Sequence, residues 1–254
     1  KNFKNVIWIK WDLKKKIKKK FISVPKYIIH CAIDQKYLIK NKKKYIQSNN
    51  TIIKNLINFA NKNKVKLIMN MSSIDVYGDI KKNLLNESYH FNKPNVYGLF
   101  KYLSEENLYK QKINFINLRL PGILSESNKK NLMRPWLKKI IQNIKKEKDI
   151  IVCNAEKKFN NVISTNDIAD LFNYLIKKNI LLRDTFNFAA SSPLPLNLLL
   201  NYIKKKLNSK SKIIQINNTK NKSFYISSKK LENKTKYKIP STKSIIKKYI
   251  EKFK

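Results

Sequence analysis

Glycine is scarce in this chain of 254 residues, which contains only Gly78, Gly98 and Gly122. The stretch before Gly78 therefore has no glycine-rich turn of the kind that lets a backbone approach a phosphate. Cysteine is nearly as rare, and Cys31 and Cys153 lie far apart in apolar surroundings, which predicts buried thiols in a reducing compartment. No apolar run approaches the ~18–20 residues of a membrane span, and no signal peptide opens the chain. We therefore expect a cytoplasmic protein without a membrane partner.

Acidic residues and arginine are also few. Asp and Glu number 16 against 56 Lys and Arg, for a net charge of +40, and the arginines are Arg119, Arg134 and Arg183. Proteins that read bases and phosphates use arginine heavily, because its planar fork binds bidentately. The excess of Lys, Asn and Ile, which share AT-rich codons, favours codon bias on a solvated surface. We expect no specific nucleic-acid partner, although a basic polyanion-binding module stays an alternative.

What the chain does contain is an alternation of apolar runs and segments of helical spacing. The expected strands are 6–9, 27–33, 65–73 and 113–120, and the expected helices between them are 45–60 and 96–111. Buried parallel strands read as continuous apolar runs, and crossover helices join them. The pattern predicts an α/β fold with a doubly wound parallel sheet.

Beyond residue 124 the order loosens and predicts a smaller α+β region. We expect a helix over 130–147, a strand near 150–153, a helix opened by a capping box of Ser164 and Asp167, a strand over 184–190, and helices near 195–207 and 242–253. The chain is therefore divided into 1–124 and 125–254, and some elements of the second part are expected to pack back on the first sheet.

Tyrosine and lysine stand four residues apart at six places, and in a lysine-rich chain that spacing alone means little. A tyrosine that acts as general acid or base must be activated, and an ammonium one helical turn away favours its phenolate. The pair must also lie at the carboxyl ends of parallel strands, where α/β sheets bind ligands. Only Tyr97 and Lys101 meet both conditions, because they open an expected helix and follow a strand that ends in Ser72 and Ser73.

Eight stretches in the same order resemble the extended short-chain dehydrogenase/reductases, the NAD-dependent epimerase/dehydratase family that acts on nucleotide sugars. They are WDL (11–13), YIIHCAI (27–33), NNTIIKNLINFA (49–60), SSIDVYG (72–78), YGLFK (97–101), LRLPGIL (118–124), FNNVISTNDIADLF (159–172) and FNFAASSPLPL (186–196). The resemblance implies a Rossmann-like sheet in 1–124, NAD or NADP as cofactor, and a nucleotide sugar as substrate bound mainly by 125–254.

The resemblance also implies roles for individual residues. Tyr97 would take a proton from a sugar hydroxyl, Lys101 would favour the phenolate and hold the nicotinamide ribose, and Ser73 would bond the reacting oxygen. The implied cofactor contacts are Asp12, Leu13, Cys31, Ala32, Asn50, Tyr97, Lys101, Pro121 and Ile123. The implied substrate contacts are Ser73, Asp75 and Arg134, and no metal site is expected.

Several residues have a structural alternative. Asp12 could cap a helix, Asn50 could bond only backbone, and Arg134 could lie on the surface. His30, on its apolar strand, and Cys153 are expected in the core.

The chain departs from the family at its start and after Ser73. The family opens with a strand, a G-x-x-G-x-x-G turn and a helix, whereas VIWIKWDL (6–13) matches its third strand, so the first strand–helix–strand unit is absent. We expect an N-terminally truncated fragment, with natural loss of the loop as the alternative.

The second departure concerns the reaction. Dehydratases carry an Asp-Glu pair directly after the catalytic residue, where this chain has Ile74 and Asp75. This difference argues against dehydration and leaves an epimerase or a keto-reductase. A degenerate, inactive member of the family is the other hypothesis, and homodimerisation stays open.

Overall fold

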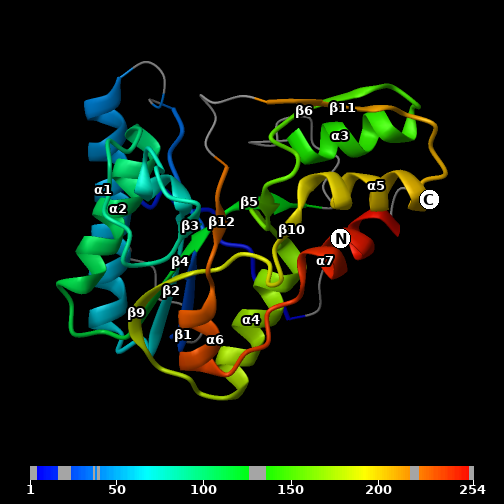
Figure 1. Cartoon of the computed structure of the whole chain (residues 1–254). Helices are drawn as coiled ribbons and strands as arrows, with labels where there is room; N and C mark the ends of the chain where they lie inside the picture. Colours follow the sequence, from blue (N-terminus) through cyan, green and yellow to red (C-terminus); the bar gives the residue numbers. More distant parts are fainter. Residues whose placement is uncertain are drawn as a thin grey trace.

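The centre of the molecule is a parallel four-stranded sheet with the strand order β1-β2-β4-β9 (Figure 1). The computed structural model describes residues 5–16, 24–36, 38, 41–125, 136–217 and 223–251. The four strands are β1 (Tyr27–His30), β2 (Leu67–Ser73), β4 (Phe115–Leu120) and β9 (Arg183–Asn187). The prediction of an α/β fold with a parallel central sheet is confirmed.

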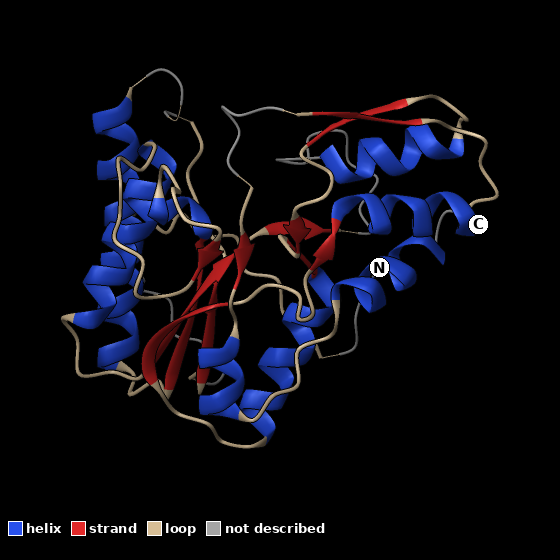
Figure 2. Ribbon diagram, viewed as in Figure 1, coloured by secondary structure: helices blue, strands red, loops and turns tan. Residues whose placement is uncertain are grey.

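Helices cover both faces of this sheet (Figure 2). On one face, α1 (Lys42–Lys62) and α2 (Val96–Tyr109) pack side by side, and their apolar side chains meet those of β2 and β4. On the other face lie α4 (Thr165–Lys177) and α6 (Lys229–Thr235). Parallel neighbours need such long crossovers, because a tight turn cannot bring the chain back to the same end of the sheet.

Side-chain caps fix the starts of three of these helices. Asn41 accepts a hydrogen bond from the backbone of Lys44 at the start of α1, and Asn95 accepts one from Gly98 at the start of α2. Ser164 opens α4 with a capping box, as the sequence predicted. These caps satisfy N–H groups that have no partner inside the helix.

A row of polar side chains crosses the interior of the sheet under α1 and α2. His30, Asn70, Asn117 and Thr185 stand in register on the four strands. Asn70 donates to Asn117 and Asn117 donates to Thr185, each at 2.9 Å. These bonds satisfy the donor and acceptor groups that they join, which would otherwise be costly to bury, whereas Asn70 Oδ1 is buried without a hydrogen-bond partner among the described residues.

The remaining elements lie beside one end of the sheet (Figure 1). They are η1 (Ile74–Tyr77), β3 (Leu84–Leu85), β5 (Gly122–Leu124), α3 (Trp136–Lys145), β6 (Ile150–Cys153), β7 (Lys158–Phe159), β8 (Val162–Ser164), β10 (Leu194–Pro195), α5 (Leu196–Lys206), β11 (Ile213–Ile216), β12 (Tyr225–Ile226) and α7 (Thr242–Ile250). The division of the chain at residue 124 stays a prediction. Two elements from beyond that residue contact the first sheet: β9 is one of its strands, and α4 packs on its face.

The prediction of a buried strand at 6–9 is wrong. This segment has no regular structure, and Trp8 is 80% exposed. An apolar run is buried as a strand only where neighbouring strands pair with it, and none of the described strands pairs with 6–9.

The prediction that both cysteines are buried is also wrong, because both are exposed free thiols. Cys153 ends β6, whose side chains alternate between buried and exposed, and it falls on the outer face. Cys31 follows the last residue of β1, where the strand leaves the sheet.

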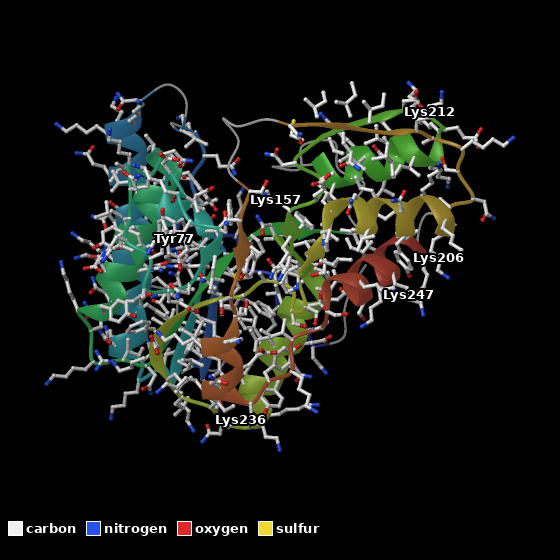
Figure 3. All side chains as sticks on the ribbon, viewed as in Figure 1. Tyr77, Lys157, Lys206, Lys212, Lys236 and Lys247 are labelled. Carbon is white, nitrogen blue, oxygen red and sulfur yellow. The ribbon has the colours of Figure 1, made fainter. Side chains whose placement is uncertain are left out.

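Lysine side chains project from several sides of the molecule (Figure 3). Lys157, Lys206, Lys212, Lys236 and Lys247 come from different segments, and all are exposed. Of the helices that the structure describes, none is long and apolar enough to cross a membrane.

Candidate active site

Ser73 ends β2 at the carboxyl edge of the sheet, where parallel sheets bind their ligands. Its Oγ accepts a hydrogen bond from the backbone N–H of Asp75 at 3.2 Å and thereby caps η1. Because Oγ is the acceptor in this bond, the hydroxyl proton can be donated to another group. Asp75, a predicted substrate contact, is half-buried in the first turn of η1.

Tyr97 and Lys101 lie in the first turns of α2, which packs directly on η1. Gly98, between them, has no side chain, and this allows the helix to approach the backbone of Asp75. The helix start that carries Tyr97 is therefore held against the turn that follows Ser73.

Lys101 is 5% exposed and points toward the end of β2. Its Nζ donates to the carbonyl oxygen of Met71 at 2.5 Å and lies 5.7 Å from the centre of the Tyr97 ring. Burial lowers the pKa of Lys101 to about 8, against the opposing effects of Cys31 and Glu105. The structure thus brings the predicted Tyr–Lys pair to the strand end that presents Ser73.

Two groups at the end of β1 also face Lys101. His30 is buried, as predicted, and its pKa is lowered to about 4, first by burial and then by the charge of Lys101. Cys31 is exposed at the surface, but partial desolvation still raises the pKa of its thiol, and Lys101 opposes this shift. Both groups are therefore neutral near pH 7, which leaves Lys101 as the charged member of this cluster.

A buried polar network beneath the site was missed by sequence reasoning. Glu105 of α2 accepts a hydrogen bond from Ser72 Oγ at 2.5 Å and others from Nε and Nη2 of Arg119, whose Nη2 lies 2.6 Å from Oε2. Arg119 Nη1 donates to the Tyr77 hydroxyl at 3.0 Å, and that hydroxyl donates to Asn187 Oδ1 at 2.7 Å. An acid four residues after Lys101 and an arginine inside an apolar strand were the available signals.

Arg119 keeps its charge in this network despite burial. Burial works against the charge of Arg119, but the hydrogen bonds and charge of Glu105 outweigh it and raise the pKa of Arg119. Burial raises the pKa of Tyr77 to about 12, so its hydroxyl stays protonated. Tyr77 therefore serves as a neutral hydrogen-bonding link in this network.

The remaining predicted cofactor residues lie at other strand ends. Pro121 is buried directly after β4, and Ile123 in β5 is 44% exposed. Ala32 is half-buried two residues after β1. Arg134 lies outside the described residues.

Asp12 and Leu13 belong to a turn that is tied to α1. Asp12 Oδ1 accepts a hydrogen bond from the backbone of Lys14 at 3.0 Å, and the described residues 13–15 form a turn, so the alternative that Asp12 caps a helix stays a prediction. The carbonyl oxygen of Leu13 accepts one from Asn55 Nδ2 at 3.0 Å.

Asn50 bridges two helices rather than bonding backbone. Its Oδ1 accepts a hydrogen bond from Asn107 Nδ2 at 2.8 Å, so the alternative of backbone bonding is wrong. The neighbouring Asn49, which sequence reasoning missed, is 1% exposed and holds both the backbone N–H and the carbonyl oxygen of Asp34. Asn49 therefore fixes the loop that follows β1.

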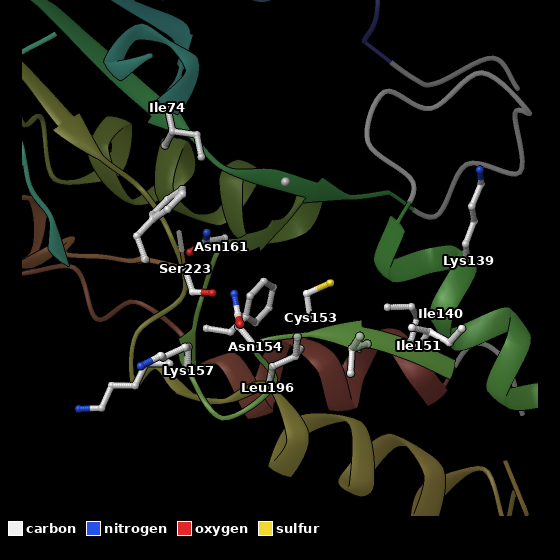
Figure 4. A pocket seen from close by; sticks show the side chains of 15 residues that line it. Ile74, Lys139, Ile140, Ile151, Cys153, Asn154, Lys157, Asn161, Leu196 and Ser223 are labelled. Carbon is white, nitrogen blue, oxygen red and sulfur yellow. The ribbon is translucent and has the colours of Figure 1, made fainter. Parts of the chain in front are cut away.

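A cavity of about 700 Å³ opens beside the strand ends. It is lined by Ile74 and Gly122, each one residue beyond Ser73 or Pro121, and by residues around β6, β7 and α3. In Figure 4 the polar ends of Asn154, Asn161 and Ser223 gather on one side, and Lys139 projects from α3 on the other. Its volume is within the range of sites for small organic ligands.

The fold and the site define a Rossmann-like α/β protein with a Ser–Tyr–Lys group at the carboxyl edge of its sheet. A family model described as the NAD dependent epimerase/dehydratase family matches residues 2–189. The chain belongs to this family.

Similar proteins include one curated relative and many solved structures. The chain is 28% identical over 227 residues to the uncharacterized protein MJ1055 of Methanocaldococcus jannaschii, over 84% of this chain and 67% of that protein. RMD from Pseudomonas aeruginosa, solved with NADPH, has 14% identity and a TM-score of 0.72 over 96% of this chain and 88% of its own.

Two further structures are similar at comparable levels. UDP-N-acetylglucosamine 4-epimerase from Bacillus cereus has 18% identity and a TM-score of 0.71 over 90% of this chain and 79% of its own. WbmG from Bordetella bronchiseptica, solved with NAD and UDP, has 13% identity and a TM-score of 0.69 over 90% and 73%. At these identities the likeness establishes the fold.

Proposed function

We propose that this protein is an NAD(P)-dependent epimerase or keto-reductase that acts on a nucleotide sugar. The observation that carries the proposal is the placement of Lys101 and Tyr97 on a helix packed against the strand end that presents Ser73. Membership of a family described as NAD dependent supports it, as do similar structures that contain NADPH, NAD or UDP.

The residues at this edge fit the nicotinamide and ribose half of the cofactor. Lys101 offers an ammonium beside Tyr97, and the exposed side chain of Ile123 offers an apolar contact. The pyrophosphate half has no matching cradle among the described residues. Such a cradle needs a glycine turn before a helix, whereas Gly78 follows η1, and Gly98 and Gly122 lie within α2 and β5.

Tyr97, Lys101 and Ser73 have different roles in the proposed reaction. When bound, the nicotinamide supplies hydride acceptance and return. Tyr97, as phenolate, takes the proton of a sugar hydroxyl, and the charge of Lys101 favours that form of Tyr97. Ser73 donates its hydroxyl proton to the same sugar oxygen and fixes its position. The absence of an acid at Ile74 favours epimerisation or reduction over dehydration.

We assign the nucleotide part of the substrate to the cavity of about 700 Å³. Lys139, Lys157 and Lys158 supply positive charge for a diphosphate, and Phe159 and Phe224 supply aromatic surface for a base. Asp75 is assigned to the sugar, and Arg134 remains a proposed contact. Because Ile74 and Gly122 line the cavity, a nucleotide bound there would place its sugar near Ser73.

The test is an assay of the protein, as its gene encodes it, with UDP-, ADP- and GDP-sugars and their keto forms. An epimerase converts the sugar with no net change in the absorbance of reduced nicotinamide, whereas a keto-reductase consumes NAD(P)H in equal amount. No turnover of any nucleotide sugar by a folded protein would contradict the proposal.

A further inference from the structure

Two residues of α2, one helical turn apart, hold two consecutive residues of β2 just below the candidate site. Lys101 Nζ donates to the carbonyl oxygen of Met71 at 2.5 Å, and Glu105 accepts from Ser72 Oγ at 2.5 Å. The next residue along the strand is Ser73. The helix is therefore fastened to the strand end at two points directly before the residue that would contact substrate.

Glu105 also joins a third element to this contact. It is 1% exposed, and its carboxylate pairs with Arg119 of β4, which stands in register with Ser72. The guanidinium of Arg119 lies 4.8 Å from the ring centre of Tyr77 and 5.2 Å from that of Phe91, so its position is fixed by packing as well as by charge. Glu105 thus links α2, β2 and β4 at one buried position.

We propose that Glu105 is a positioning residue, which fixes Ser73 relative to Tyr97 by holding α2 to β2 and β4. This inference rests on the proposed function. A bidentate pair has a narrow geometry, so a sliding movement of α2 along β2 would break it. Catalytic groups displaced by about 1 Å lose rate by roughly 100-fold, which makes such a constraint relevant to turnover.

The test compares Glu105→Gln with the unaltered protein, both as the gene encodes them. This substitution keeps the shape and removes the charge. We expect kcat to fall by about 100-fold, with KM for the nucleotide sugar unchanged. Glu106→Gln, one residue further along the same helix, is the matched control and should match the unaltered protein.

A second variant covers the case in which Glu105→Gln does not fold because Arg119 loses its partner. Ser72→Ala removes only one contact of Glu105 and no charge, so it should lower kcat and leave KM unchanged. Full activity of Ser72→Ala, or a folded Glu105→Gln variant with the kcat of the unaltered protein, would overturn the inference. Full activity of Tyr97→Phe in the same series would instead overturn the proposed function.

Discussion

Gly98 and Asp75 meet so closely that a Cβ on Gly98 would lie 2.1 Å from the carbonyl oxygen of Asp75. No real Cβ approaches a backbone oxygen to that distance. The contact joins the helix that carries Tyr97 and Lys101 to the turn that follows Ser73. The distance between the helix that carries Tyr97 and the turn that follows Ser73 is therefore set by the contact at Gly98.

Gly98→Ala should lower the free energy of unfolding by about 1–3 kcal/mol, the usual cost of forcing extra atoms into a packed interior. In an unconstrained helix the same change would stabilise, since alanine is the better helix former by about 1 kcal/mol. Urea titration measures the effect. Gly122→Ala is the matched control, because its Cβ would lie 3.2 Å from the nearest atom, the carbonyl oxygen of Asn161. An equal or smaller loss for Gly98→Ala would contradict the argument.

Tyr97→Phe should lower turnover by about 10²- to 10⁴-fold and leave cofactor binding nearly intact, because only the proton transfer is removed. Steady-state kinetics and a cofactor titration on the protein as the gene encodes it measure both quantities. Tyr174→Phe and Tyr202→Phe are the controls, since each tyrosine also stands four residues before a lysine. If either control were as damaging and Tyr97→Phe harmless, the wrong pair has been chosen.

His30 should make the fold sensitive to acid. Its pKa falls from 6.5 to about 4 on folding, so the unfolded chain takes up the proton first as the pH drops. Stability that is present above pH 6.5 should be lost progressively down to about pH 4, by about 3 kcal/mol in all.

The measurement is urea unfolding across that pH range for the unaltered chain and for His30→Gln. The variant should lose less stability than the unaltered chain by the stated amount. His90→Gln, which changes the other, exposed histidine, should follow the unaltered chain. Parallel curves for all three proteins would show that His30 does not carry the effect.

The 254-residue chain should bind NAD and NADP weakly, because the contacts available to it orient a nicotinamide and ribose but provide no glycine turn for the pyrophosphate. Calorimetric titration of NAD and NADP into this chain measures the affinity. Micromolar binding by the 254-residue chain would contradict the prediction and would indicate that lysines hold the phosphates.

The elements of the sheet could be predicted from the sequence, because strands buried on both faces are predominantly apolar. That rule located β2 and β4 to within two residues. It failed at 6–9, which has the same composition, because burial depends on whether another strand lies alongside. Local sequence does not contain that information.

Part of the candidate site could also be predicted, because some of its residues are close together in the sequence. Tyr97 and Lys101 are neighbours on one helix, and the order of elements places that helix after Ser73. The pair of Glu105 and Arg119 was missed, because charged side chains are ordinarily at the surface and only the packing of α2 on β4 brings these two together.

The buried amides of Asn70 and Asn117 have a consequence for how the sheet assembles. If β2 slipped by one residue along β4, one of the two amides would turn to the opposite face of the sheet. There, Asn70 would lie opposite Leu118, or Asn117 opposite Met69, instead of opposite its amide partner. Misaligned pairings are thereby penalised during folding, even though the hydrogen bond itself adds little net stability. The two amides therefore favour one register between β2 and β4, so the ends of both strands reach the site in one arrangement.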